Sequence, residues 1–498
     1  MASTELARKI IRDFIEHGIT EFVLSPGSRN APLSIALYEA EQRGLVNLHI
    51  RIDERTAGFF ALGIVKATNK PAVVVCTSGT AVANYYPAFL EAFHTDQPLI
   101  VLSADRPARL RQTGANQTTN QVHLFNCGRY FDGANYELHS TGPTHINVEF
   151  DEPLLLNDKS DWLTGLVKGQ VKEELTSDNL KVEEFQVPKG KGILIIGHDG
   201  LAAQDFAKEL AVPVIAENPL VYPNAIVHAP LFSNQIDVDW AVVIGRTTLS
   251  RSTNALIAKA KETYVIDPRA KRIDPKRSAT RIFETLPKIV GSAEPWNLHS
   301  EFMKLDSWSE PAVAQVLSES LPDGSTLYVA SSRPIRDLEA FAKPRSGVEV
   351  LANRGLAGID GNISTALGIA SKRAATFALL GDLAFLHDLT ALVNQEPINL
   401  KLLVVNNDGG GIFSTLPQAG VDGFEKIFGT AHGHDLAAIA RSFNIPVTEI
   451  SSLDGLRDYL KPATKFEIAI LKMPSRSENA KLIKELSEKL LEKLEKLT

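Results

Sequence analysis

Residues 377–411 read FALLGDLAFLHDLTALVNQEPINLKLLVVNNDGGG. The apolar run Phe377-Ala378-Leu379-Leu380 ends in Gly381-Asp382, and a second apolar run ends in the polar, glycine-rich segment from Asn406 to Gly411. Short apolar runs that end in such turns, joined by a segment long enough for a helix, are typical of parallel strands. Open sheets of this kind bind ligands beyond the carboxyl ends of their strands. The stretch therefore predicts an α/β fold with a ligand site at one sheet edge.

The same alternation of apolar strands and helical segments extends along the chain and divides into three regions. Strands are expected at 22–24, 48–52, 72–77 and 99–103, then at 192–196, 212–216, 240–244 and 263–267, and finally at 326–330, 348–351, 376–380, 402–405 and 467–471. Stretches without strands separate the regions. We predict three doubly wound parallel-sheet domains at 1–156, 191–290 and 312–498, with linkers at 157–190 and 291–311 and a helix at the C-terminus.

The composition is that of a globular protein, with 44% hydrophobic and 22% charged residues over 498 positions. A net charge of −7 argues against a general nucleic-acid binder. Two cysteines, Cys76 and Cys127, cannot form a disulfide framework, so we expect a reducing compartment, the cytoplasm. The sequence shows neither a secretory signal near Met1 nor an apolar run long enough to span a bilayer, so no membrane partner is expected.

Asp382 and Asn407 each follow a predicted strand and supply oxygen ligands of the kind that a hard divalent cation prefers. The glycines from Gly409 to Gly411 leave a backbone carbonyl free and let N–H groups approach a diphosphate. For either turn alone, an ordinary strand-to-helix turn is the simpler interpretation, because Asp, Asn and Gly favour turns. The two turns together favour a cation site. The nucleotide motifs GxxxxGK and GxGxxG and the zinc-protease motif HExxH are absent from the sequence.

The first region presents a second set of polar residues after its strands. Glu54 follows one strand, Ser28-Arg29 another, Ser78-Gly79 a third and Arg106 a fourth. Three of these residues have a simpler interpretation as well: Glu54 as part of a helix N-terminus, Ser28 as a helix cap and Arg29 as a surface arginine. Because neither set is complete alone, we expect a site shared between two domains or two subunits.

Eight segments of the two outer regions carry a family resemblance. They read SPGSRNAPLS from Ser25, DERTAGFFALG from Asp53, TSGTAVANYYPA from Thr77, SADRP from Ser103, GANQ from Gly114, NRGLAGIDG from Asn353, GDLAFLHDL from Gly381 and NNDGGGIFSTLP from Asn406. Together they resemble thiamine-diphosphate enzymes and, more narrowly, the 2-succinyl-5-enolpyruvyl-6-hydroxy-3-cyclohexene-1-carboxylate synthase family of menaquinone biosynthesis. The middle region resembles that family chiefly through GRTTLSR from Gly245. The resemblance implies a pyrimidine-binding first domain and a diphosphate-binding third domain.

The resemblance also implies roles for individual residues. Glu54 would be the catalytic residue and would hydrogen-bond the aminopyrimidine ring of thiamine diphosphate, while Asp382, Asn407 and the Gly409 carbonyl would bind Mg²⁺ or Mn²⁺ on its diphosphate. Further residues implied to contact the cofactor are Ser78, Gly79, Ile359, Gly381, Leu383, Ile412 and Phe413. Residues implied to contact substrates are Ser28, Arg29, Arg106, Asn116, Gln117, Arg251, Ser332, Arg336 and Arg354.

The implied reaction is the decarboxylation of 2-oxoglutarate and the conjugate addition of the resulting succinyl carbanion equivalent to isochorismate. The resemblance places the active sites between the subunits of a homodimer or of a dimer of dimers. Two alternatives stay open: another thiamine-diphosphate 2-oxoacid decarboxylase or carboligase, and a non-catalytic cofactor-binding protein on the same fold. Arginines at Arg29, Arg336 and Arg354 favour substrates with several carboxylates over pyruvate, because guanidinium groups bind carboxylates in a two-pronged geometry.

The sequence departs from the broader family at two places, and the role of the middle region stays undecided. Leu383 stands where a second glycine usually follows Gly-Asp, which agrees with the narrower family. The segment from Tyr130 to Gly142 is short, as though a helix of the first domain were missing, and this puts packing and subunit contacts in question. In the middle region the residue after Arg251 is Ser252 and not a second basic residue, so the role of that region stays open.

Overall fold

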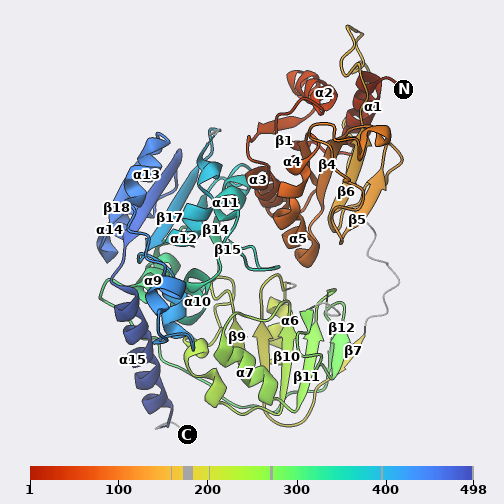
Figure 1. Ribbon diagram of the computed structural model, residues 1–498. Helices are drawn as coiled ribbons and strands as arrows, with labels where there is room; N and C mark the ends of the chain where they lie inside the picture. Colours follow the sequence, from red (N-terminus) through yellow and green to blue (C-terminus); the bar gives the residue numbers. More distant parts are fainter. Residues whose placement is uncertain (159, 172–182, 201, 270–272, 394–395, 496–498) are drawn as a thin grey trace.

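The computed structural model describes residues 1–158, 160–171, 183–200, 202–269, 273–393 and 396–495. Three parallel β-sheets of five or six strands dominate it, and helices flank each of them (Figure 1). The predicted fold class, α/β with three doubly wound parallel sheets, is confirmed. A small additional sheet pairs two short strands beside the middle sheet.

The first sheet has six parallel strands in the order β2-β1-β3-β4-β6-β5. They are β1 Glu21–Leu24, β2 Asn47–Ile50, β3 Ala72–Cys76, β4 Leu99–Asp105, β5 Arg129–Asp132 and β6 Thr144–Glu149, and the helices are α1 Ser3–Glu16, α2 Ala31–Gln42, α3 Glu54–Thr68, α4 Thr80–Asn84 and α5 Tyr86–Thr95. Val73 and Val75 belong to the apolar cluster of α1 and α2, whereas Val74 belongs to that of α3 and α5. Successive strand residues point to opposite faces, so a strand buried on both faces reads as a continuous apolar run.

The middle sheet has five parallel strands in the order β12-β11-β10-β8-β9. They are β8 Gly192–Ile196, β9 Val214–Ala216, β10 Trp240–Ile244, β11 Glu262–Ile266 and β12 Arg281–Phe283. Helix α6 (Gln204–Leu210) packs on one face through Phe206, and α7 (Arg251–Lys259) packs on the other through Leu256. The small sheet beside it pairs β7 (Glu184–Gln186) with β13 (Lys288–Val290).

The third sheet has six parallel strands in the order β15-β14-β16-β17-β19-β18. They are β14 Ser325–Val329, β15 Val348–Leu351, β16 Thr376–Gly381, β17 Leu400–Asn406, β18 Val447–Ile450 and β19 Phe466–Lys472. The helices of one face are α9 Glu310–Ser320, α10 Arg333–Phe341 and α14 Leu453–Tyr459, and those of the other face are α11 Asn362–Ala370, α12 Asp382–His387 and α13 Leu436–Ser442. The predicted C-terminal helix is α15 (Arg476–Glu495), and its Leu490 packs against the middle domain.

Six short strands were not predicted, namely β5, β6, β7, β12, β13 and β18. Strand β7 lies inside the stretch 157–190 that was predicted to be a linker, and α9 begins inside the predicted linker 291–311. The limits of the three domains remain a prediction.

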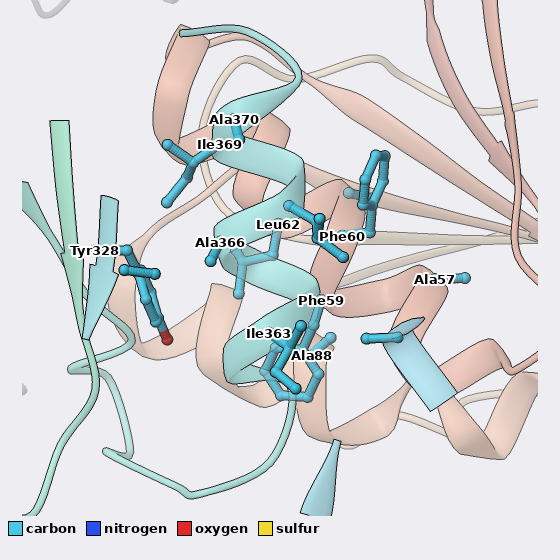
Figure 2. Close-up of a cluster of buried hydrophobic side chains, with 14 of the residues drawn as sticks. Ala57, Phe59, Phe60, Leu62, Ala88, Tyr328, Ile363, Ala366, Ile369 and Ala370 are labelled. Atoms are coloured by element: carbon cyan, nitrogen blue, oxygen red, sulfur yellow. The ribbon is translucent and has the colours of Figure 1, made fainter. Parts of the chain in front are cut away.

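The first and third sheets share one apolar core, which is built around the crossing of α3 and α11 (Figure 2). Two glycines make this crossing possible. A Cβ atom on Gly368 would lie 3.0 Å from the Cα atom of Gly63, and closer still to the carbonyl oxygen of Phe60. The two helices therefore touch along their backbones, and the crossing joins the helix that begins at Glu54 to the third domain.

The short segment between β5 and β6 contains no helix, and residues 133–143 are all described. Tyr136 lies in this connection and stacks on Phe14 of α1, with ring centroids 5.7 Å apart. An aromatic side chain thus covers an edge of the core where a crossover helix would otherwise pack. Among the described residues, no helix is both long and apolar enough to cross a membrane.

Candidate active site

A cavity of about 400 Å³ opens at the carboxyl edge of the third sheet, beyond β14, β16 and β17. The structure brings ten of the predicted site residues into its lining: Ser332, Arg336, Ile359, Gly381, Asp382, Leu383, Asn407, Gly409, Ile412 and Phe413. Leu249 of the middle domain completes part of the wall. The predicted residues of the third region therefore line one cavity, and its role as a ligand site remains a prediction.

Asp382 is buried at the start of α12 and is held by backbone N–H groups. Its Oδ1 atom accepts a hydrogen bond from the Leu383 N–H at 2.7 Å, and its Oδ2 atom accepts one from the Gly409 N–H at 2.9 Å. Burial raises the pKa of the Asp382 carboxyl, and the two N–H groups oppose that rise. His432 approaches the same Oδ2 atom, with its Nε2 at 3.4 Å.

Asn407 lies just beyond β17, and the two ends of its amide have different surroundings. Its Nδ2 atom donates to Oε1 of Glu310 at 2.6 Å. Its Oδ1 atom is buried and has no hydrogen-bond partner among the described residues. A buried acceptor without a partner is costly, and a bound cation would satisfy it. This orphaned oxygen shows that the Asn407 side chain fits a metal site.

The glycines beside Asn407 are required because other atoms of the chain lie too close to leave room for a Cβ atom. Gly409 has φ of +130°, and a Cβ there would collide with the carbonyl oxygen of Gly429. A Cβ on Gly411 would lie 2.5 Å from Nδ2 of Asn407. Among the described residues, no cluster of three or more His, Cys, Asp or Glu side chains forms a metal site. A cation here would therefore depend on one carboxylate, one amide oxygen and backbone carbonyls, a donor set that suits Mg²⁺ or Mn²⁺.

The remaining wall of the cavity is apolar. Ile412 and Phe413 lie in a short 3₁₀ helix, η5 (Gly411–Thr415), and the Phe413 ring packs against Phe428. Ile359 lies in the loop between β15 and α11 and is 44% exposed, so its side chain is free to contact a ligand. These three side chains give the cavity a hydrophobic wall opposite its polar edge, as a cofactor with an aromatic ring requires.

Glu54 stands at the carboxyl edge of the first sheet, as the first residue of α3. Asp53 caps this helix and accepts hydrogen bonds from the N–H groups of Arg55 and Thr56. Burial and the neighbouring Asp53 raise the pKa of the half-buried Glu54 carboxyl. Glu54 therefore does lie at a helix N-terminus, as the simpler interpretation held. The raised pKa of its carboxyl group also suits a residue that shares a proton with a ligand.

Ser78, Arg106 and Gln117 form one hydrogen-bonded group at the same edge. The Ser78 hydroxyl donates to the Gln117 carbonyl at 2.9 Å, and Nη1 of Arg106 lies 2.6 Å from Oγ of Ser78 and 2.7 Å from the same carbonyl. The Gly79 N–H donates to Oε1 of Gln121 at 2.9 Å. Asn116 and the Gln117 side chain are exposed. These contacts position the loop and leave its outer side chains facing solvent.

Two of the simpler interpretations are wrong. Ser28 is exposed and does not cap α2, whose N-cap residue is Asn30. Arg29 is no surface arginine, because only 11% of its side chain is exposed. Its Nη1 atom donates to the Phe150 carbonyl at 3.1 Å and lies 3.2 Å from a carboxylate oxygen of Glu152.

The structure does not bring the two sets of predicted residues into one cavity within a single chain. None of Ser28, Arg29, Glu54, Ser78, Gly79, Arg106, Asn116 and Gln117 belongs to the lining of the third-sheet cavity as far as the structure describes the chain. Within one chain the predicted residues therefore form two groups, each of which would be a partial site at the edge of one outer sheet.

Arg354, predicted to contact substrate, is buried and already paired. Its Nε and Nη2 atoms lie 2.6 Å and 3.1 Å from the two carboxylate oxygens of Glu217 in the middle domain, and Nη2 also donates to the Thr247 carbonyl. Arg354 is absent from the described lining of the cavity. In this arrangement Arg354 joins two domains, and no local sequence pattern points to its partner Glu217.

Arg336 and Arg251 meet at a second cavity of about 520 Å³, which adjoins the first and lies between the middle domain, α10 and α15. Burial and the nearby Arg333 and Arg354 lower the pKa of Arg336 to about 10. The same side chain donates to the Ser332 carbonyl at 2.7 Å, and Ser332 has φ of +70° at the start of α10. The exposed Arg251 begins α7. Arg333, which the sequence analysis missed, lines both cavities beside Ser332.

Both halves of the candidate site match known families. Residues 4–124 match the family described as thiamine pyrophosphate enzyme, N-terminal TPP binding domain, and residues 337–471 match thiamine pyrophosphate enzyme, C-terminal TPP binding domain. These two matches contain Glu54 and the Asp382–Asn407 pair, respectively. The middle domain lies in neither.

The chain is also similar over nearly its full length to curated proteins with one common name, 2-succinyl-5-enolpyruvyl-6-hydroxy-3-cyclohexene-1-carboxylate synthase. The protein of this name from Nocardioides sp. is 39% identical, with 94% of each chain covered. That from Lysinibacillus sphaericus is 32% identical, with 97% of each chain covered. Among solved structures, benzoylformate decarboxylase from Polynucleobacter necessarius matches with a TM-score of 0.71 at 16% identity, covering 95% of this chain and 99% of its own. That likeness shows the fold.

Proposed function

The chain belongs to the 2-succinyl-5-enolpyruvyl-6-hydroxy-3-cyclohexene-1-carboxylate synthase family of thiamine pyrophosphate enzymes, and we propose that it uses its two partial sites to carry out that synthase reaction. It is a transferase of menaquinone biosynthesis that depends on thiamine diphosphate. The reaction joins a succinyl unit from 2-oxoglutarate to isochorismate with loss of carbon dioxide. The observation that carries the proposal is the cavity that unites Asp382, Asn407 and Gly409 with an apolar wall.

The third domain would hold the cofactor's diphosphate through a divalent cation. Asp382 and Asn407 supply a carboxylate and an amide oxygen, and Gly409 would add its carbonyl. The orphaned Oδ1 of Asn407 supports this assignment. When bound, thiamine diphosphate supplies an electron sink for cleavage of the bond to the carboxylate that is lost. Ile412 and Phe413 would exclude water beside it, and Ile359 would support it.

Glu54 would hold a proton against the ring nitrogen of the aminopyrimidine. A carboxyl group whose pKa is raised by burial is suited to share a proton at that atom. Ser78 and Gly79 would shape the same edge. Their loop is already fixed by Arg106 and Gln121, so the pyrimidine edge would be ordered before the cofactor binds.

Both substrates carry carboxylates, and the arginines near the two edges supply complementary charge. Arg29, Arg106, Arg251 and Arg336 are the proposed contacts, with Ser28, Asn116, Gln117 and Ser332 as hydrogen-bond partners. Arg354 stays a predicted contact, although Glu217 satisfies its guanidinium group without substrate. Burial lowers the pKa of Arg336, and a substrate carboxylate would offset the cost of burying its charge.

The incomplete cavity supports assembly from at least two copies of the chain. Glu54 and the cation ligands do not line one cavity within the described chain, so a second copy would supply the missing edge. We propose a homodimer or a dimer of dimers with active sites between subunits. Light scattering should then report at least twice the mass of one chain. We also propose a cytoplasmic location, because Cys76 and Cys127 are both free thiols.

The experiment that tests the proposed reaction is an absorbance assay of isochorismate with thiamine diphosphate, Mg²⁺ and 2-oxoglutarate. Loss of isochorismate that requires every component is expected, with a product of the matching mass. Release of carbon dioxide without loss of isochorismate would assign the chain to another 2-oxoacid decarboxylase or carboligase. Cofactor binding without either reaction would favour a non-catalytic protein.

A further inference from the structure

We propose that Glu310 is a positioning residue for the metal site, which turns the amide of Asn407 so that its oxygen faces the cation. No role for Glu310 follows from the family matches, since it lies outside both matched segments. The inference rests on the proposed cation site and adds to it the residue that sets the orientation of one ligand.

The two ends of the Asn407 amide differ in the hydrogen bonds that they can form. An asparagine side chain can turn over and exchange its NH₂ group, which only donates, with its oxygen, which only accepts. A carboxylate accepts hydrogen bonds and cannot donate them. The NH₂ end must therefore face Glu310, and the observed contact is Nδ2 of Asn407 to Oε1 of Glu310 at 2.6 Å. The oxygen is left on the opposite side, where it is buried and without a partner among the described residues.

Glu310 is itself buried and contacts residues of two other helices. It is the first residue of α9 and only 4% exposed. Its N–H donates to Oδ1 of Asn479 on α15 at 3.1 Å. Nε of Arg333 lies 3.8 Å from its other carboxylate oxygen, and Arg333 also pairs with Asp337. The carboxylate that orients Asn407 is thus part of a fixed, partly neutralised group.

The space around the amide is equally restricted. Because a Cβ on Gly411 would lie 2.5 Å from Nδ2 of Asn407, the glycine leaves just enough room for the NH₂ group on the Glu310 side. If the amide turned over, its NH₂ group would face the cation, and its oxygen would face the Glu310 carboxylate. Both contacts would be repulsive, so the carboxylate selects one orientation of the ligand.

The first test measures binding of Mn²⁺ in the presence of thiamine diphosphate, with free Mn²⁺ followed by electron paramagnetic resonance. Glu310→Ala removes the acceptor, so both amide orientations become accessible and the dissociation constant should rise by about 10- to 100-fold, as for other residues that orient metal ligands. Glu310→Gln keeps an oxygen that can accept from Nδ2, so its dissociation constant should stay much closer to that of the parent. Equal losses in the two variants would contradict the proposal.

The second test repeats the comparison in an Asn407→Asp background, where the ligand has two equivalent oxygens and no orientation to select. There, Glu310→Ala should weaken Mn²⁺ binding no more than Glu310→Gln does, because both variants remove the same charge and no amide is left to orient. A general structural defect of Glu310→Ala would make it bind more weakly than Glu310→Gln in both backgrounds. The disappearance of the difference between the two variants therefore separates orientation from stability, and a difference that persists in the Asn407→Asp background would overturn the inference.

Two controls separate this inference from the proposed function. Asp388→Asn changes another buried carboxylate of the third domain, which accepts hydrogen bonds from Ser364, and should leave Mn²⁺ affinity unchanged. If the parent protein with thiamine diphosphate failed to bind Mn²⁺, the proposed cation site would be wrong and the inference with it. If the parent bound Mn²⁺ but the difference between Glu310→Ala and Glu310→Gln did not depend on Asn407, only the role of Glu310 would be wrong.

Discussion

Replacing Gly368 with alanine should push apart the two helices that join the first and third domains. The added Cβ would lie 3.0 Å from the Cα atom of Gly63 and closer to the Phe60 carbonyl oxygen. Carbon atoms are best separated by about 3.5–4.0 Å, so the backbones must move apart by at least roughly 0.5–1 Å. Neither neighbour is a side chain that could turn away.

The expected magnitude follows from two opposing effects. Overpacking a buried site costs about 1–3 kcal/mol, and backbone neighbours place this site at the upper end. Alanine in place of glycine inside a helix recovers about 1 kcal/mol. The net loss is therefore about 2 kcal/mol, which corresponds to a fall of roughly 4–8 °C in the melting temperature of a domain of this size. Because α3 begins at Glu54, turnover should fall as well.

The assay is thermal unfolding followed by circular dichroism, with turnover measured on the same samples. Gly455→Ala in α14 is the matched control, since the nearest atom to its added Cβ is a serine hydroxyl at 3.0 Å and not backbone. The control should be unchanged or slightly more stable. If Gly368→Ala were as stable as the parent, the close helix contact would not hold the two domains together as described.

Three further outcomes are expected. Glu54→Gln should lower turnover by about 10²- to 10⁴-fold while calorimetry shows nearly unchanged binding of thiamine diphosphate; unchanged turnover would remove Glu54 from the reaction. Arg354→Leu should leave Glu217 buried without its partner and lower the free energy of unfolding by about 3–5 kcal/mol in urea titrations, whereas a change confined to KM would assign Arg354 to substrate binding instead. Burial lowers the pKa of His49, but hydrogen bonds to Glu21 and Glu396 outweigh it and raise that pKa. The stability that His49 contributes should therefore be complete below its unfolded pKa of about 6.5 and decline as the pH rises through the higher folded pKa, so His49→Gln should destabilise more at pH 6 than at pH 9.

The interior strands could be predicted because burial on both faces leaves a continuous apolar run. Strand β10 reads WAVVI and strand β8 reads GILII, and both have the predicted bounds. The strands that were missed are short or polar. Strand β7 reads EFQ and β18 reads VTEI, and each lies at the edge of its sheet. Several of their side chains are exposed to solvent, so these strands do not read as continuous apolar runs.

Strand β6 was missed for a different reason, because its polar residues are buried. It reads THINVE, and Ser103 of β4 lies 2.8 Å from both His145 Nε2 and Asn147 Oδ1. Hydrogen bonds across the sheet make these side chains compatible with the interior. A sequence pattern that counts apolar residues cannot reveal partners that lie about 40 positions away.

In the candidate site, too, some residues could be predicted from local sequence patterns and others could not. The positions of residues on the turns that follow strands could be predicted, since Asp382, Asn407 and Glu54 stand at the sheet edges where parallel sheets bind ligands. Residues that act through distant partners could not. Glu310 precedes its partner Asn407 by 97 positions, and Glu217 precedes Arg354 by 137. Such pairs arise from the packing of one domain element on another and leave no local signal.

The central claim is that thiamine diphosphate lies between Glu54 of one subunit and the Asp382–Asn407 edge of another. Mixed dimers of an Asp382→Asn chain and a Glu54→Gln chain, isolated with two different affinity tags, test it most directly. Each variant alone should be nearly inactive. A mixed dimer would carry one site with both lesions and one site with neither, so it should recover about half of the parental activity. Mixed dimers as inactive as the single variants would show that each site is built within one chain and would contradict the claim.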